Sequence, residues 1–385
     1  MTDSGAATPQ LLRRVNAMAV LTHLRGTQEA TATELMAASG LTRASVIAVS
    51  EDLVRRGWIT EVVASGAALG AGRPARRFEL NAMAGVVVGV DIGAATTTAS
   101  VADLRGTILG TASRSCRDTQ IVAAERISVI DTVCLAALDD AGSTAASVLA
   151  VTAGLAAPVS NDGTLLASQP FWRQFDVGLR SALHDLHGWR VLLENDANLA
   201  ALGERWRGTG TGVDHLVVLL ASERLGAGII ESGRLLHGAR GAAGEMSFLE
   251  LVEGVGSTAG IAALVREWAP VPGTEPAEVF AAAARGDCAS AAVLARIAER
   301  MARVITALSS LLNPEQLVLG GAVAESAGVL LPAMTARLAE LSPTPPRVTV
   351  SALGDGIVTV GAVRHALDFV ETHTLDVRLP ATPPA

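Results

Sequence analysis

The sequence contains no lysine and no tyrosine, and only 3% of its residues are aromatic. All 30 basic residues are therefore arginine, in a chain that is rich in alanine. This usage is expected of a GC-rich genome. No single arginine indicates a function by its residue type alone.

Cysteine is also scarce. Cys116, Cys134 and Cys288 lie far apart and form no Cys-x-x-Cys pair. Disulfide frameworks and structural zinc sites both need thiols at close, repeated spacing. We therefore expect neither a disulfide nor a bound metal ion.

Long hydrophobic runs are missing as well, and the first residues, MTDSGAATPQ, lack a basic segment followed by an apolar one. We expect a cytoplasmic protein without membrane contact. Half of the 385 residues are apolar, which is enough for more than one domain with its own core.

Charge is unevenly distributed. Through Leu80 the chain has nine arginines and seven acidic residues, a net charge of +2, and the remainder has 21 against 31, a net charge of −10. A basic N-terminal segment on an acidic body fits a DNA-reading head attached to a ligand-binding domain.

The first 80 residues have the pattern of three helices and a hairpin. The expected elements are helices over 10–24 and 33–38, a third helix that Thr42 caps and that runs to about Arg56, and strands over 58–63 and 76–80. This order is typical of a winged helix-turn-helix domain, whose third helix enters the major groove of DNA.

Within that domain we expect DNA contacts from the third helix and from the loop GRPARR. The candidates are Arg43 and Ser45 on the helix, and Arg73, Arg76 and Arg77 in the wing. The alternative is a small helical dimerisation domain with ordinary solvated arginines.

A second pattern begins at Val86. An apolar run ends in Asp91-Ile92-Gly93, and a second strand is expected over Thr96 to Ala102. A strand that ends in Asp-x-Gly and folds back resembles the first phosphate loop of sugar kinases with the actin-like, ribonuclease H-like fold. Those kinases have Gly and Thr next, whereas this chain has Ala94 and Ala95.

Further along, helices and strands alternate to about residue 320. The expected helices cover 119–140, 177–186, 199–207, 278–285 and 289–312, and the expected strands cover 148–152, 191–193, 216–220, 228–231 and 317–319. The Pro-rich end has no such pattern, and we expect residues 371–385 to be a disordered tail.

Taken together, these features resemble the ROK family (repressors, open reading frames and kinases) over about residues 10–370. The most specific segments are ENDANLAALGE at 194–204 and GAAGEM at 241–246. The resemblance implies an α/β fold, with a winged helix-turn-helix domain over 1–80 followed by a two-lobed sugar-kinase-like domain over 81–370. Family members with this head resemble sugar-responsive transcription factors.

The resemblance also implies a sugar site. Asn195, Asp196 and Glu245 match the family's sugar-binding residues, and Asp196 stands where the kinases have the general base on the sugar hydroxyl. The alternative is that Asn195 and Asp196 only cap the helix that follows them.

Several family positions differ in this chain. Where the family has the Gly-His of its zinc site, this chain has Ser247-Phe248, and the zinc loop that follows is replaced by the thiol-free LVEGVGSTAG. The family's second phosphate loop aligns with Arg224-Leu225-Gly226. The family's Pro-Gly after the third strand is replaced by Ala156-Ala157, and one of its sugar-binding Asn residues is replaced by Phe171. Phe171 and Phe248 would make the sugar pocket less polar, and the phosphate partners are lost.

Three functions follow from these matches. The first is a DNA-binding regulator, expected to be a repressor, that senses a sugar or sugar derivative without phosphorylating it. We expect this regulator to use no cofactor and to act as a homodimer or homotetramer. Closure around the sugar would move the paired heads. The second is an active ATP-dependent sugar kinase with an added head, and the third is a regulator that no longer binds a ligand.

Overall fold

The computed structural model describes residues 9–62, 75–115, 122–166, 170–322 and 324–380. Its first part is a small helical domain, called the head here. The head contains α1 (Pro9–Gly26), β1 (Ala30–Thr31), α2 (Ala32–Ser39), α3 (Arg43–Arg55), β2 (Ile59–Val62) and β3 (Arg77–Leu80). The strands pair antiparallel in the order β1-β3-β2. The predicted winged helix-turn-helix plan is confirmed.

Local hydrogen bonds explain where α2 and α3 begin. Thr31 and Glu34 form a capping box at α2, and Gly40 ends that helix with a left-handed φ of 68°. The Thr42 side chain accepts a hydrogen bond from the Ser45 backbone N–H, so Thr42 caps α3 as predicted. These caps fix the short turn between α2 and α3.

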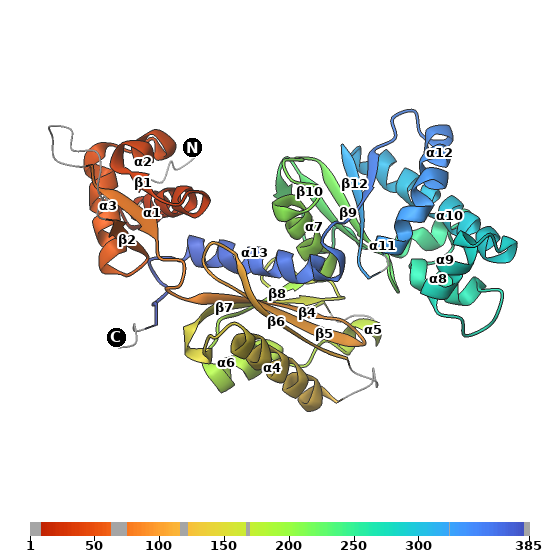
Figure 1. Cartoon of the computed structure of the whole chain (residues 1–385), viewed down its shortest axis with the longest axis horizontal. Coiled ribbons are helices and arrows are strands. Elements are labelled where there is room, and N and C mark those ends of the chain that lie inside the picture. Colours follow the sequence, from red (N-terminus) through yellow and green to blue (C-terminus); the bar gives the residue numbers. More distant parts are fainter. Residues whose placement is uncertain (1–8, 63–74, 116–121, 167–169, 323, 381–385) are drawn as a thin grey trace, which may run out of the picture.

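The body has two lobes. In the first, a sheet of order β6-β5-β4-β7-β8 is covered by helices (Figure 1). Its elements are β4 (Val86–Ile92), β5 (Thr96–Ala102), β6 (Ile108–Ser115), α4 (Ala123–Asp140), β7 (Val148–Leu155), α5 (Pro170–Arg173), α6 (Leu179–His187) and β8 (Val191–Asn195).

The second lobe repeats this design with a sheet of order β11-β10-β9-β12-β13. Its elements are β9 (Leu216–Leu220), β10 (Gly226–Glu231), β11 (Arg234–Leu235), α8 (Ile261–Trp268), α9 (Pro276–Ala284), α10 (Cys288–Leu312), β12 (Gln316–Gly320), α11 (Ala324–Ala327), α12 (Leu331–Leu341) and β13 (Arg347–Val350). In each lobe three antiparallel strands are followed by parallel ones. This is the predicted two-lobed, ribonuclease H-like arrangement.

Two helices, α7 (Asp196–Arg207) and α13 (Ile357–Thr372), lie between the sheets (Figure 1). They cross closely because glycines face the other helix. A Cβ added at Gly361 would lie 1.7 Å from the Leu199 carbonyl oxygen, and one at Gly203 would lie 2.6 Å from that of Ile357. Only glycine permits this approach, so the pair fixes how α13 sits on α7.

The head shares a hydrophobic core with the first lobe and α13. Leu21 and Leu24 of α1 belong to the same buried cluster as Val87 of β4 and Leu367 and Val370 of α13. The Arg105 guanidinium adds hydrogen bonds to four carbonyl oxygens at the end of α1, those of Leu24, Arg25, Thr27 and Gln28. The head is therefore packed onto the first lobe, beside the end of α13 (Figure 1).

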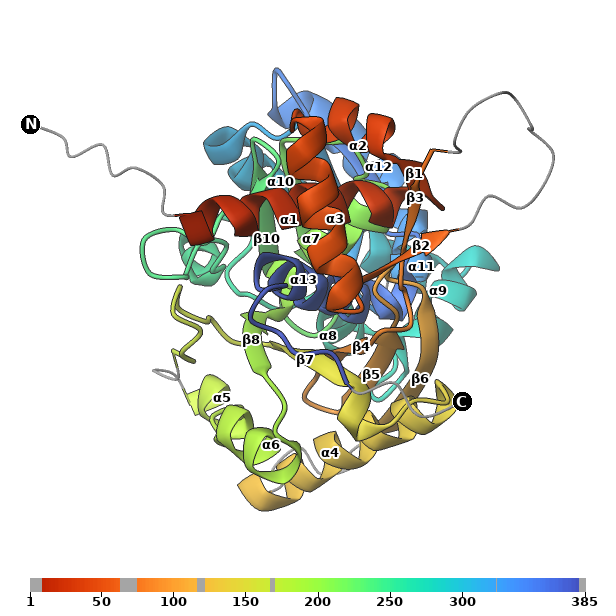
Figure 2. The same cartoon turned by 90° about the vertical axis from the view of Figure 1, so that its left-hand side faces the viewer.

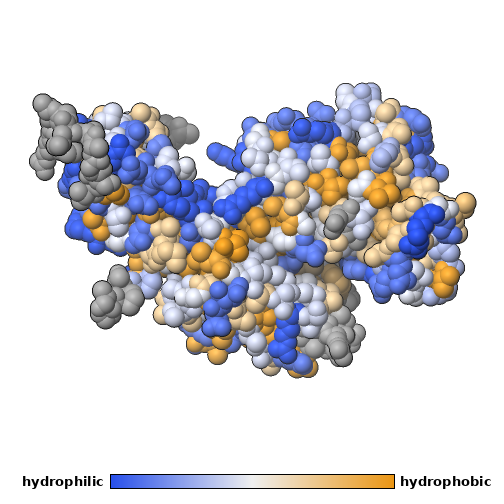
Figure 3. Space-filling model, in the orientation of Figure 1, coloured by the Kyte–Doolittle hydropathy of each residue, from blue (hydrophilic) through white to orange (hydrophobic). Residues whose placement is uncertain are grey.

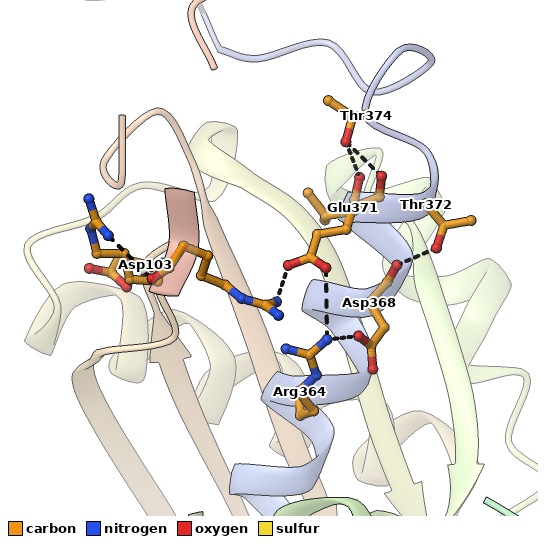
Figure 4. Close-up of polar contacts among 9 residues, drawn as sticks. Asp103, Arg364, Asp368, Glu371, Thr372 and Thr374 are labelled. Atoms are coloured by element: carbon orange, nitrogen blue, oxygen red, sulfur yellow. Dashed lines mark hydrogen bonds and ion pairs between the residues drawn. The ribbon is translucent and has the colours of Figure 1, made fainter. Parts of the chain in front are cut away.

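A charged cluster closes the same junction. Glu371 of α13 pairs with Arg25 of α1 and lies 3.8 Å from Arg364, which also pairs with Asp368 (Figure 4). Arg25, Glu371 and Arg364 are each about 15–16% exposed. Burial and the nearby Arg25 lower the pKa of Arg364 to about 10.

The C-terminal segment differs from the prediction of a disordered tail over 371–385. Leu375, Val377 and Leu379 pack against the core that the head shares with the first lobe, and Thr374 is buried. The Leu375 carbonyl accepts a hydrogen bond from Arg56. Alternate apolar side chains thus order residues 373–380 on the head, while 381–385 lie outside the described residues.

Surface character differs between the parts of the molecule. Hydrophilic residues cover much of the head, and hydrophobic residues gather on the body between the head and the second sheet (Figure 3). Among the described residues, no helix has both the length and the hydropathy to cross a bilayer.

Candidate functional site

Strand order brings the sequence-predicted residues to one edge of the first sheet. β4, β7 and β8 run parallel, and their register aligns Asp91 with Gly154 and Gly154 with Glu194. The carboxyl ends of β4 and β8 therefore meet at the same edge, where ligands of such sheets commonly bind. Asp91 lies at the first end, and Asn195 and Asp196 lie at the second.

Asn195 and Asp196 begin α7. The Asn195 Oδ1 accepts a hydrogen bond of 3.1 Å from the Asn198 N–H, and its Nδ2 donates to the Ala157 carbonyl at 3.2 Å. The Asp196 Oδ1 accepts from the Ala197 N–H at 2.8 Å. Capping is confirmed for Asn195, whereas ligand contact by either residue stays a prediction.

Four carboxyl groups interact electrostatically around this helix start. Burial, and then the charge of Asp355, raise the pKa of Asp91 to about 7. Burial, and then the charges of Asp91 and Glu245, raise the pKa of Asp196 to about 7. Burial also raises the pKa of Glu245, against a smaller opposing effect of Arg224. With a pKa of about 7, Asp91 and Asp196 can hold a proton near neutrality, so each can both accept and donate hydrogen bonds to hydroxyl groups.

A pair formed by a buried glutamate and a half-buried histidine beside this cluster was missed by the sequence analysis. Glu194 accepts a hydrogen bond of 2.8 Å from the Nε2 of His237, and its other oxygen accepts from Asn198 at 2.9 Å. Burial alone would raise the pKa of Glu194, but these hydrogen bonds hold it below its usual value, and the pair raises the pKa of His237. His237 follows β11, so the pair joins the second lobe to the first.

The segments that match the phosphate loops are apolar or blocked. Ala94 and Ala95 form the turn between β4 and β5, where no side chain can donate to a phosphate. Leu225 is buried in the core of the second lobe. The Arg224 guanidinium lies 5.0 Å from the centre of the Phe171 ring, so a side chain of the second lobe stacks on one of the first.

Of the two phenylalanines expected in the pocket, Phe248 packs against the core of the second lobe, and Phe171 lies edge-on to Phe175 at 5.8 Å between ring centres.

An arginine holds the loop that matches the family's zinc loop. Arg300 of α10 is 3% exposed and donates hydrogen bonds to the carbonyl oxygens of Val255, Ser257 and Ala259 at 3.1, 2.6 and 2.9 Å. Within the described ranges, no group of three or more His, Cys, Asp or Glu side chains could hold a metal ion. Because guanidinium donors bind the loop backbone and thiols are missing, these residues do not fit a zinc ion.

The residues of the head that are predicted to contact DNA differ in their exposure and in their ion pairs. Arg43 is exposed at the start of α3, whereas Ser45 is half-buried and its hydroxyl lies 3.0 Å from that of Thr42. Arg76 forms ion pairs of 2.8 Å with two glutamates, and Arg77 pairs with another, which leaves both wing arginines internally neutralised. Arg73 lies outside the described residues.

Comparison with known proteins gives two matches along the chain. Residues 87–368 match the ROK family, and residues 15–62 match the IclR helix-turn-helix domain. The second match covers α1 to β2, which are the elements that form the head's DNA-binding motif.

Similar proteins include both kinases and regulators. A glucokinase of Halalkalibacterium halodurans is 31% identical over 192 residues, which are 42% of this chain and 56% of the glucokinase. A xylose repressor of Caldicellulosiruptor bescii is 22% identical over 339 residues, 80% of this chain and 84% of the repressor.

A solved structure of a ROK family transcriptional regulator, a homologue of the E. coli MLC protein, superposes with a TM-score of 0.76 at 20% identity. The superposition covers 94% of this chain and 98% of the regulator. The likeness therefore includes both the head and the body.

Proposed function

The chain belongs to the ROK family, and from this premise we propose that it is a DNA-binding transcriptional regulator whose body senses a sugar or sugar derivative. The observation that carries the proposal is the helix-turn-helix head, joined to a complete two-lobed body. A head of this kind serves to place a helix in the major groove. We assign the protein to the cytoplasm, where such DNA is accessible.

The ligand would bind between the lobes. Asp196 directly follows β8 of the first lobe, at the start of α7 between the sheets, and Glu245 lies on the loop that follows β11 of the second lobe; their charges interact. The carboxyl groups of Asp196, whose pKa is about 7, and of Glu245, together with the amide of Asn195, suit the vicinal hydroxyls of a sugar. A ligand that contacts both lobes favours the arrangement in which they are closest.

The sugar would not be phosphorylated. Phosphoryl transfer depends on donors that position and neutralise the phosphate chain. Here Ala94 and Ala95 form the first loop, Leu225 is buried, and Arg224 stacks on Phe171. These substitutions favour a sensor over an enzyme.

Regulation would require at least a dimer. Two heads read half-sites about one helical turn apart, so a change in their spacing alters DNA affinity. A homodimer satisfies this need, and a homotetramer would allow two operators to be bound. Whether the regulator represses or activates depends on where its site lies in a promoter, and the xylose repressor similarity favours repression.

Binding to duplex DNA tests the first part of the proposal. Full-length protein should select a preferred sequence from a random duplex library, and Arg43→Ala should weaken that site by about 1–3 kcal/mol and relax one base position. Arg285→Ala, at an exposed position far from the head, is the matched control. Failure of the parent protein to select any sequence would contradict the regulator.

The second candidate function is an active sugar kinase, which the retained Asp91 and Asp196 favour. ADP formation from ATP over a panel of hexoses, pentoses and amino sugars separates the two functions. We expect no sugar-dependent ADP above the ATP-only background. Sugar-dependent ADP that disappears in Asp196→Asn would establish the kinase instead.

A further inference from the structure

A groove on the head lies between the first turns of α1 and the second half of α3. Its volume is about 600 Å³, and Leu375 and Asp376 of the C-terminal segment close one end. Four arginines line it, Arg13 and Arg14 from α1 and Arg55 and Arg56 from α3. We call it the arginine groove.

Positive charge in the arginine groove exceeds negative charge. The acidic side chains that line it are Asp52 and Asp376, so the lining carries four positive and two negative charges. Asp52 pairs with Arg55 and Arg56 at 3.0 Å, and Asp376 pairs with Arg14 at 2.5 Å. Arg13 is exposed and forms no ion pair with another described residue.

The ion pairs in the groove are accessible to solvent. The Arg55 side chain is 74% exposed, Arg56 43% and Arg14 38%. Exposed pairs of this kind contribute little stability and are screened by salt. A phosphate group can therefore replace a carboxylate as partner without disrupting the fold.

The groove borders the face that α3 presents to solvent. Ala44, Ala48, Glu51 and Arg55 recur at helical spacing along that face, and all four are exposed. Ala48 and Arg55 also line the arginine groove. Figure 2 shows α3 in front, with the first turns of α1 on one side and β2 and β3 on the other.

On the opposite flank of α3 the arginine side chains are already paired with glutamates. Arg76 pairs with Glu51 and Glu61, and Arg77 pairs with Glu29. Two arginines there face three glutamates. Among the described residues of the head, the excess positive charge beside α3 therefore lies on the α1 side.

From this asymmetry we propose that the arginine groove holds the sugar–phosphate backbone of duplex DNA while α3 lies in the major groove. The proposal rests on the DNA-binding function proposed above. Guanidinium groups bind phosphate oxygens through paired, charge-assisted hydrogen bonds. Arg13, which has no competing carboxylate among the described residues, and Arg55, whose side chain is 74% exposed, make the main contacts. Such contacts position the head and carry no base preference.

Salt dependence of DNA binding tests the groove. Binding of full-length protein to its selected duplex is measured at several salt concentrations, for the parent and for the double variant Arg13→Gln/Arg55→Gln. Each phosphate contact that is lost should reduce the slope of log K against log salt by about 0.9, so the double variant should lose about 1.8. The order of preference among duplex sequences should not change.

Two further variants sharpen the result. Asp52→Asn removes a competing carboxylate and should tighten binding and steepen the slope. Arg285→Gln, exposed on the second lobe, should leave the slope unchanged. All four altered side chains are at least partly exposed, and melting curves verify that each variant is folded.

The outcomes are distinct. If the parent binds its duplex and the double variant has the same salt slope as the parent, the groove proposal is wrong and the proposed regulator function still holds. The groove would then serve another partner. A parent that binds no preferred duplex overturns the proposed function itself. A reduced slope with altered base preference also contradicts the proposal, because it would place these arginines at base edges.

Discussion

Capping and ligand binding compete for the same atoms at Asn195. Its Oδ1 already accepts the Asn198 N–H and its Nδ2 donates to Ala157, which leaves one amide hydrogen and one lone pair of the oxygen for a sugar. Asp196 and Glu245 have more free acceptor capacity, since the Asp196 carboxylate accepts hydrogen bonds only from the N–H groups of Ala197 and of Asp196 itself among the described residues. At this scale Asp196 and Glu245 are better candidates than Asn195 for recognising hydroxyls.

Sequence motifs could identify these residues but not their partners. ENDAN contains Asn195 and Asp196 in adjacent positions, so a local pattern suffices. His237 meets Glu194 across 43 positions and between two lobes, and no local pattern predicts that. The ion pairs of Arg76 and Arg77 could not be predicted from the sequence for the same reason, because Glu51 and Glu29 lie in other parts of the chain.

Burial of Asp196 predicts how stability depends on pH. Its folded pKa of about 7 exceeds the ordinary value of 3.8, so the native state binds more protons than the unfolded state between these values. The free energy of unfolding therefore falls as pH rises through this window. Asp196→Asn removes that loss and should be more stable than the parent at pH 8, by on the order of 1–3 kcal/mol.

The difference should shrink at pH 5, and thermal melts at both pH values measure it. Asp162→Asn is the control of opposite sign, since hydrogen bonds from Ser160 and Thr164 lower the pKa of the exposed Asp162. That variant should not gain stability at pH 8. An Asp196→Asn gain that is equal at both pH values would contradict the role of ionisation.

Among the elements, local pattern predicted the buried strands and long helices best. β5 and β9 have the predicted bounds, and α10 begins at Cys288, one residue before the prediction. α13 was not predicted, because Gly361 interrupts it and its buried residues lie on several faces, which hides a helical period. Its role as the contact between α7, the first sheet and the head depends on tertiary packing.

We propose that the Arg300 guanidinium takes, in the loop over 251–260, the place that the family resemblance gives to a zinc ion. Arg300→Met should destabilise the protein by about 3 kcal/mol or more, because it leaves the carbonyl oxygens of Val255, Ser257 and Ala259 without donors. Arg303→Met on the same helix is the control, since Arg303 forms a half-exposed pair with Glu299 and should change stability by about 1 kcal/mol or less.

Denaturant unfolding of the two variants measures this difference. Metal analysis of protein purified without chelator should find less than one zinc per chain in the parent. One zinc per chain, or equal losses in the two variants, would contradict the replacement.

The junction between α13 and the head depends on one carboxylate. Glu371→Gln leaves the mostly buried Arg25 without its counter-charge and next to Arg364, which keeps only the partly exposed Asp368, and should cost about 2–4 kcal/mol. Asp368→Asn, at a side chain that is 45% exposed, should cost about 1 kcal/mol or less. Unfolding curves compare the two, and a larger loss for Asp368→Asn would contradict the role of Glu371.

For the whole molecule, the shared core makes the head and the first lobe one mechanical unit. Leu24, Val87 and Leu367 lie in one cluster, while the second lobe has a core of its own. A ligand held by Asp196 and Glu245 would therefore change the angle between the second lobe and the unit that carries the head. This is a physical route from sugar to DNA that needs no loosening of the head.

The most direct test of the central claim is equilibrium binding of the full-length protein to its selected duplex, measured by fluorescence anisotropy with and without millimolar sugars, at fixed salt. We expect the protein to prefer one sequence and its Kd for that duplex to change at least severalfold with one sugar. We also expect Asp196→Asn and Glu245→Ala to remove this response to sugar while DNA affinity is kept. Binding that no sugar alters, in a protein that forms ADP from ATP when sugar is added, would contradict it.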